Sequence, residues 1–208
     1  LHDDCTQRPH TAVLLAYASR FNDKAELWVD KTPANERFLD RIWQEMPAAK
    51  IIVPVRNPVA VLSSRKKMEP GLNLRQALLD LLMSFKVAIE QSEANDPKFF
   101  LVRYEELSGE PEATMQKLAA FLEIEYSDLL NIPTVAGMPA GANSSFKQDA
   151  APGQILKQNE HEQNEGLSKK EMDLLSVALG KHSGKLGYPL IKIGFLRRVY
   201  LRLKYRLW

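Results

Sequence analysis

A positively charged side chain follows an apolar, β-type run in the segment "IIVPVRNPVAVLSSR", Ile51 to Arg65. Arg56 stands where the apolar run stops. Asn57 then fits the N-cap of a helix, and Pro58 fits its first turn. Both a helix N-terminus and a guanidinium attract anions, and open α/β folds bind anions where a strand leads into a helix. The segment therefore predicts a phosphate site.

A second segment, "LWVDKTP", repeats this order of residue types. An apolar run is followed by Lys31, by Thr32 as a predicted N-cap, and by Pro33 as a predicted first helical residue. If the two predicted strands are neighbours in a parallel sheet, Lys31 and Arg56 face the same crevice at the carboxyl ends of the strands.

Ser64 lies seven residues beyond Asn57, about two helical turns along the same face. Its hydroxyl can therefore share an anion with Arg56. A guanidinium offers a planar fork suited to a stable phosphate, whereas a lysine acts as a compact charge. We expect Arg56 to hold a phosphate and Lys31 to stabilise charge that develops during a reaction. The alternative is that both cations are ordinary surface or salt-bridge residues.

Strands and helices alternate along the chain, which predicts an α/β fold with a three-layer parallel sheet flanked by helices. The predicted strands are Ala25–Val29, Lys50–Val55 and Phe99–Tyr104. The predicted helices are Pro9–Phe21, Pro33–Glu45, Pro58–Lys67, one with an apolar stripe from Leu74 to Ile89, one that begins at Pro111, and one capped by Ser168 and Glu171 that stops near Gly187.

Two regions depart from this alternation. Residues 131–166 are rich in Gly, Pro, Asn and Gln, and so long an irregular segment is typically a functional lid or a disordered stretch. We assign residues 1–190 to one α/β domain that includes this lid-type segment. Residues 191–208 are predicted to form a separate basic amphipathic helix.

Composition limits the classes of protein that fit. The chain has 208 residues, of which 45% are hydrophobic and 26% charged, as suits one soluble domain with a sizeable core. Cys5 is the only cysteine, which excludes an internal disulfide and a cysteine-based metal cluster. The four histidines lack ligand spacing, so no metal site is expected: His2, His10, His161 and His182.

The net charge of +2 conceals a basic C-terminal segment. Residues 191–208 carry six Lys and Arg and no acid, and removing these six from the 28 basic residues leaves 22 against 26 acidic residues. An apolar stripe is predicted at helical spacing: Leu196, Val199, Tyr200, Leu203 and Leu207. Such a helix binds an anionic membrane surface or an acidic partner. The alternative is a helix packed on the domain with solvated arginines.

Three motifs resemble the sulfotransferases that use 3′-phosphoadenosine 5′-phosphosulfate (PAPS), and the likeness is greatest to the bacterial and tyrosylprotein-type branch. "VRNPVAVLSS" is similar to the family's 3′-phosphate motif, which implies that Arg56 and Ser64 bind that phosphate. "VDKTP" resembles the segment that carries a catalytic lysine, here Lys31. "LVRYEEL" is similar to a segment whose tyrosine, here Tyr104, lies near the adenosine. The alternatives are that Tyr104 is a packing residue with a solvated hydroxyl, and that Arg103 is a partner for Glu105 or Glu106.

The resemblance extends from about Trp28 to Tyr188 and is looser after Asn131. "NSSFK" and "ILKQ" resemble two late nucleotide contacts, which implies roles for Ser144 or Ser145 and for Lys157. The implied fold is the sulfotransferase form of the P-loop NTPase-like architecture.

One departure from the family concerns its N-terminal glycine-rich loop, which holds the 5′-phosphosulfate. The first glycine of this chain is Gly71, so no such loop precedes it. Glu26 lies too close to the predicted strand to be the family's catalytic base. We therefore expect the natural protein to begin upstream, and the present chain alone to be a poor catalyst.

The implied reaction is transfer of a sulfuryl group from PAPS to a hydroxyl acceptor, with 3′,5′-adenosine diphosphate (PAP) as product and without a metal. No nucleic-acid partner is expected. Contact with a membrane through residues 191–208 is one of the two alternatives given above for the C-terminal helix. The alternatives are a nucleotide kinase or another NTPase of related fold, and a non-catalytic anion-binding module with a membrane-surface helix. The acceptor, compartment and oligomeric state are not predicted.

Overall fold

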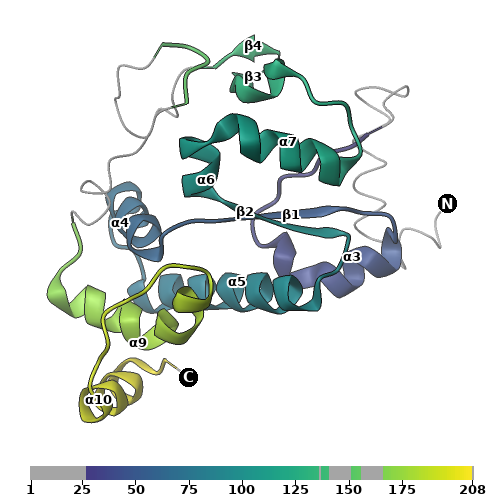
Figure 1. Cartoon of the computed structure of the whole chain (residues 1–208). Coiled ribbons are helices and arrows are strands. Elements are labelled where there is room, and N and C mark those ends of the chain that lie inside the picture. The colour runs from purple at the N-terminus through teal and green to yellow at the C-terminus, as the bar shows by residue number, and fades with distance from the viewer. Residues whose placement is uncertain (1–26, 136, 141–150, 156–165, 208) are drawn as a thin grey trace. The chain divides into compact units, whose positions relative to one another are not determined.

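The computed structural model describes residues 27–135, 137–140, 151–155 and 166–207 (Figure 1). The chain divides into two compact units, Leu1–Ile51 and Ile52–Trp208, and the boundary falls at the start of a strand. The predicted helix Pro9–Phe21 lies outside the described residues.

The described part of the first unit consists mainly of one helical segment. A 3₁₀ turn, η1 (Asn35–Phe38), leads into α3 (Leu39–Glu45). The predicted helix is thus confirmed in its main part, but it begins two residues after Pro33. The cause is Ala34, whose φ of 69° lies in the left-handed region and therefore interrupts a right-handed helix before Asn35.

The strand predicted over Ala25–Val29 is wrong in its described part. Leu27–Val29 have no regular structure and are exposed to solvent. The local hydrogen bonds serve a turn instead, because the Asp30 carboxylate accepts from the Thr32 hydroxyl at 2.9 Å and from the Asn35 amide at 2.6 Å. Thr32 consequently does not cap the helix. An apolar run becomes a strand only where a second strand pairs with it, and none of the described strands does so.

The second unit is built around two paired strands, β1 (Ile51–Val55) and β2 (Phe99–Arg103). Helices α4 (Pro58–Met68) and α5 (Leu74–Ala94) connect them, and a crossover of this kind joins parallel strands. Figure 1 shows α5 on one side of the pair and α7 (Pro111–Leu122) on the other. The predicted α/β class, with a parallel sheet between helices, is confirmed.

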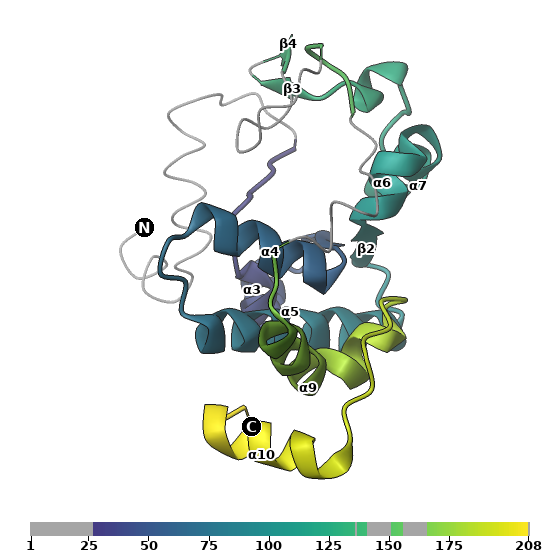
Figure 2. The ribbon, with the colours of Figure 1, turned by 90° about the vertical axis from the view of Figure 1, so that its left-hand side faces the viewer.

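The core of this unit lies where α5 packs along α9 (Lys169–Lys185), an arrangement visible in both ribbon views (Figure 2). The residues that fill it are nearly or fully buried: Leu78, Leu81, Phe85, Ile89, Leu174, Leu175 and Leu179. The capping box of Ser168 and Glu171 begins α9 as predicted. Gly187, with φ of 82°, follows its end, also as predicted.

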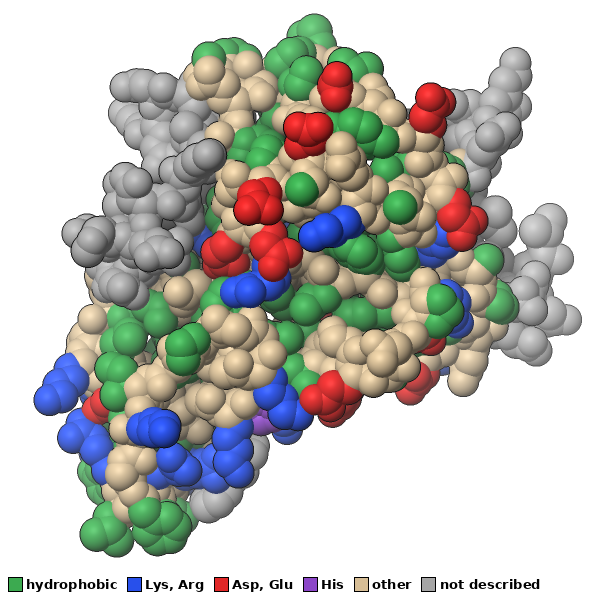
Figure 3. All heavy atoms as spheres, in the orientation of Figure 1, with side chains coloured by type: hydrophobic (Ala, Val, Ile, Leu, Met, Phe, Trp, Pro, Cys, Tyr) green, Lys and Arg blue, Asp and Glu red, His purple; other side chains and the backbone are tan. Residues whose placement is uncertain are grey.

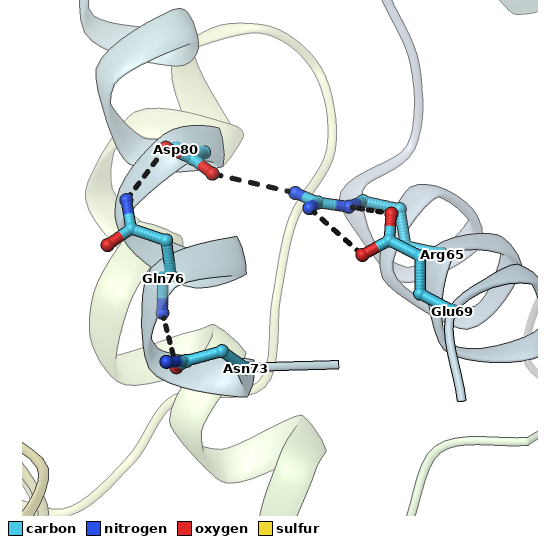
Figure 4. Close-up of polar contacts among 5 residues, drawn as sticks. All are labelled: Arg65, Glu69, Asn73, Gln76 and Asp80. Carbon is cyan, nitrogen blue, oxygen red and sulfur yellow. Dashed lines mark hydrogen bonds and ion pairs between the residues drawn. The ribbon is translucent and has the colours of Figure 1, made fainter. Parts of the chain in front are cut away.

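A polar cluster ties the end of α4 to the start of α5 (Figure 4). The Arg65 guanidinium lies 3.4 Å from Glu69 on its own helix and 3.8 Å from Asp80 on α5. Asn73 caps α5 by accepting from the Gln76 amide at 3.1 Å. Arg65 is therefore engaged in holding two helices together.

Small elements complete the second unit. They are α6 (Tyr104–Gly109), η2 (Asp128–Asn131), β3 (Thr134–Val135), β4 (Met138–Pro139) and α10 (Phe195–Tyr205). β3 and β4 form an antiparallel hairpin, in which Val135 pairs with Met138, inside the segment predicted to be irregular. Among the described residues, no helix has the length and hydropathy needed to span a bilayer.

Replacing Leu175 by alanine tests this account of the core. Leu175 is fully buried, so Leu175→Ala should lower the free energy of unfolding by about 2–5 kcal/mol, measured by urea denaturation. Leu129→Ala is the control, because the Leu129 side chain is exposed and its loss should change the value by less than about 0.5 kcal/mol. Equal effects of the two substitutions would contradict the assignment.

Candidate functional site

The carboxyl ends of β1 and β2 bring two predicted site residues together. Arg56 directly follows β1, and Tyr104 directly follows β2 as the first residue of α6. The Arg56 guanidinium carbon lies 4.4 Å from the centre of the Tyr104 ring, and both residues are half-buried. This cation–π contact fixes the guanidinium beside the start of α4.

The N-terminus of α4 is capped as the sequence predicts. Asn57 accepts from the Val59 amide at 3.0 Å through its side chain, and Pro58 occupies the first turn. The backbone amide of Asn57 donates to the Glu105 carboxylate at 2.9 Å. Two amides at this end of the helix are therefore bound within the protein, so an anion here would depend on side chains more than on the helix terminus.

Ser64 lies on α4, as predicted, and is half-buried. Its hydroxyl is 3.8 Å from the Met68 sulfur one turn further along. A thioether is a weak acceptor, so this bond would give way readily to a phosphate oxygen. No contact between Ser64 and Arg56 is present in the described structure, and their shared role stays a prediction.

Glu105 joins the start of α4 to the segment after α9. One carboxylate oxygen accepts from Asn57, and the other accepts from the Tyr188 hydroxyl at 2.5 Å. Tyr188 also accepts from Arg103 at 3.4 Å, and the Arg103 guanidinium lies 4.8 Å from the centre of the Tyr188 ring. A 3.8 Å ion pair between Arg103 and Glu106 confirms the alternative that Arg103 pairs with a neighbouring acid.

Burial is the main cause of a shifted pKa at Tyr188. The bond from Arg103 opposes this effect, and the bond to Glu105 adds to it, so that the pKa rises to about 12. The neutral phenol is thereby retained as the donor to Glu105. Gly187 admits the Arg103 side chain, because a Cβ at this position would lie 3.1 Å from the guanidinium nitrogens.

Sequence reasoning did not find the bridging role of Glu105 or any role for Tyr188. Glu105 belongs to an acidic run at the start of a helix, where carboxylates are ordinary. A usable signal was the position of "YEEL" directly after a strand. That position places a carboxylate at the same sheet edge as Asn57.

The remaining predicted residues are not brought together by the described structure. Lys31 lies in the first unit, in an exposed segment without regular structure. The described residues show neither the strand expected before Lys31 nor the helix cap expected after it. The prediction that the Lys31 segment has the same structure as the Arg56 segment is therefore wrong. Ser144, Ser145 and Lys157 lie outside the described residues.

A family model described as "Sulfotransferase family" matches residues 3–128. The chain belongs to the sulfotransferase family. The match spans Lys31, Arg56, Ser64 and Tyr104, and it ends before the segment that contains Ser145 and Lys157.

Two solved structures are similar to this sulfotransferase-family chain. They are the "Sulfotransferase Domain from the Synechococcus PCC 7002 Olefin Synthase" (18% identity, TM-score 0.49) and the "Sulfotransferase Domain from the Curacin Biosynthetic Pathway" (17% identity, TM-score 0.48). The likeness covers 94% of this chain in both cases, 63% of the first domain and 68% of the second. No curated protein is significantly similar.

The Tyr188 hydrogen bonds give a pH dependence of stability. The pKa is higher in the folded protein, about 12, than the ordinary value of 10.0. The folded state therefore holds its proton where the unfolded state releases it, and stability falls as the pH rises from about 10 to about 12. This contribution should amount to roughly 2 kcal/mol or less.

Denaturant unfolding of the wild type and Tyr188→Phe across this pH window measures the effect. The wild type should lose stability more steeply, because the variant has no phenol to titrate. Tyr126→Phe, which removes a hydroxyl from a different part of the same unit, should follow the wild-type slope. Parallel curves for the wild type and Tyr188→Phe would refute the assignment.

Proposed function

We propose that the protein transfers a sulfuryl group from PAPS to a hydroxyl acceptor and releases PAP. The observation that carries the proposal is the half-buried Arg56 guanidinium, set against Tyr104 at the carboxyl ends of two parallel strands. Family membership supports the reaction type. The site lies where open α/β sheets bind their ligands.

The residues around Arg56 suit a phosphate on a ribose. The planar fork of a guanidinium binds two phosphate oxygens at once. One face of the Tyr104 ring holds the guanidinium. We keep the place of Tyr104 near the adenosine as part of the proposal, on the resemblance alone. The Ser64 hydroxyl, which bonds only to a thioether in the described structure, supplies a further donor.

Lys31 is the proposed catalytic cation. The donor supplies a sulfuryl group whose transfer leaves negative charge on the bridging oxygen of the nucleotide. A lysine ammonium directed at that oxygen stabilises the charge as it develops. Lys31 is exposed, as a side chain that reaches toward a bound nucleotide would be. We also propose Ser145 and Lys157 as later nucleotide contacts, on the resemblance alone.

Replacing Arg56 tests the phosphate site. In the full-length protein, Arg56→Ala should weaken the binding of PAP at least about 30-fold, since a charge-assisted bidentate contact is lost. Isothermal titration calorimetry measures this change. Arg56→Lys should recover only part of the affinity, because it restores the charge without the fork.

Arg65→Ala is the matched control, because Arg65 lies on the same helix but is engaged with Glu69 and Asp80. It should leave the affinity for PAP within about threefold of the wild type. Unchanged binding of PAP by a folded Arg56→Ala protein would eliminate the proposed phosphate site.

Replacing Lys31 separates catalysis from binding. Lys31→Ala should lower kcat by about 10²–10³-fold, the effect of removing one group that stabilises transition-state charge. The affinity for the donor PAPS should change by less than about threefold, because Lys31 acts on charge that is absent from the ground state. Transfer of labelled sulfate from PAPS to a panel of alcohols and phenols gives the rate.

Lys117→Ala, which removes an exposed lysine on α7, is the control and should retain wild-type turnover. An equal loss of kcat and of PAPS affinity in Lys31→Ala would assign Lys31 to nucleotide binding instead. Normal turnover in Lys31→Ala would remove it from the reaction.

A further inference from the structure

One side of α10 holds this helix to the rest of the second unit. Leu201 is buried there, and Leu207, just beyond the helix end, is also buried. Arg197 forms an ion pair with the buried Asp173 of α9. Arg75 of α5 donates to the Arg206 carbonyl at 3.3 Å. The position of α10 on this unit is therefore fixed by both packing and polar contacts.

The apolar stripe predicted for this helix faces away from that attachment. Leu196 and Leu203 are 82% and 60% exposed, and Phe195, Val199 and Tyr200 are exposed as well. At about 100° per residue, the centre of this stripe lies roughly opposite Leu201. Leu207, which the sequence placed in the stripe, is buried, because the helix ends at Tyr205.

Cations flank the exposed stripe on both sides. Lys204 and Arg197, the latter paired with Asp173, follow one edge, and Arg202 follows the other. Arg198 lies nearer the attached side. Residues 191–208 contain no acid. Figure 3 shows Lys and Arg side chains gathered over this end of the unit, with hydrophobic side chains beside them.

We propose that α10 binds the surface of an anionic lipid bilayer, with its apolar stripe inserted among the acyl chains and its flanking cations at the headgroups. The argument is one of complementarity in both charge and polarity. In a bilayer of this kind, negatively charged headgroups lie next to an apolar interior. The basic edges of the helix suit the headgroups, and its apolar centre suits the interior. The stripe is free to insert because the attachment to α9 and α5 uses the other side of the helix.

Vesicle flotation tests the proposal with the whole chain. The wild type should float with vesicles that contain about 30 mol% phosphatidylglycerol, and the bound fraction should be at least about tenfold lower on pure phosphatidylcholine. Raising the salt from about 0.15 M to 1 M should also release it. Leu196→Glu/Leu203→Glu should abolish flotation, and Lys204→Gln should weaken binding about fivefold.

The control is Leu129→Glu, which adds an acid at another exposed leucine of the same unit and should float like the wild type. Thermal unfolding confirms that the double variant is folded, as expected when two solvent-facing side chains change. Equal flotation of the wild type and the folded double variant would overturn the proposal. Failure of the wild type to float would also overturn the proposal. Size-exclusion chromatography would then show whether the stripe joins two copies of the chain instead.

Discussion

The Glu105 carboxylate connects three parts of the second unit that are distant in sequence. It accepts from the backbone of Asn57 where β1 ends, and from the phenol of Tyr188 beyond α9. Glu105 itself follows β2. Because each of its two oxygens accepts a hydrogen bond from a different segment, the carboxylate fixes the edge of the sheet at which Arg56 emerges. A change that removed it would leave the buried Tyr188 phenol without this acceptor, which costs more than the bond itself contributes.

Local features were readable from the sequence because their causes are local. The Asn57 cap, the box formed by Ser168 and Glu171, and the stop after α9 each depend on residues within one helical turn. The strand predicted over Ala25–Val29, which the described residues Leu27–Val29 do not form, depends instead on a partner that is not local. Its residues have the apolar, β-type composition of a strand, but a strand also requires a hydrogen-bonded neighbour, and the composition of five residues carries no information about one.

The candidate site shows the same difference between residues that the sequence reveals and contacts that it does not. Arg56 was identified from residue type and position and Tyr104 from the family resemblance, yet their contact follows from the pairing of β1 with β2, which composition does not reveal. The role of Tyr188 was not predicted from the sequence, because its hydrogen-bond partner Glu105 is 83 residues away along the chain. The apolar residues of α10 were found by their spacing, but their exposure depends on which side of the helix meets α9 and α5. In this chain, the sequence indicates which side chains are candidates for the site, but it does not indicate which residues those side chains contact.

The stacking of Arg56 on Tyr104 has a consequence for selectivity. An unrestrained arginine samples many rotamers, and ordering it on binding costs as much as about 1.5–2 kcal/mol. Here the Tyr104 ring already holds the guanidinium, whose carbon lies 4.4 Å from the ring centre. At the proposed phosphate site, a guanidinium held in this way would present a planar donor array in place of a diffuse positive charge. Such an array distinguishes anions by the angle between their oxygens as well as by their valence.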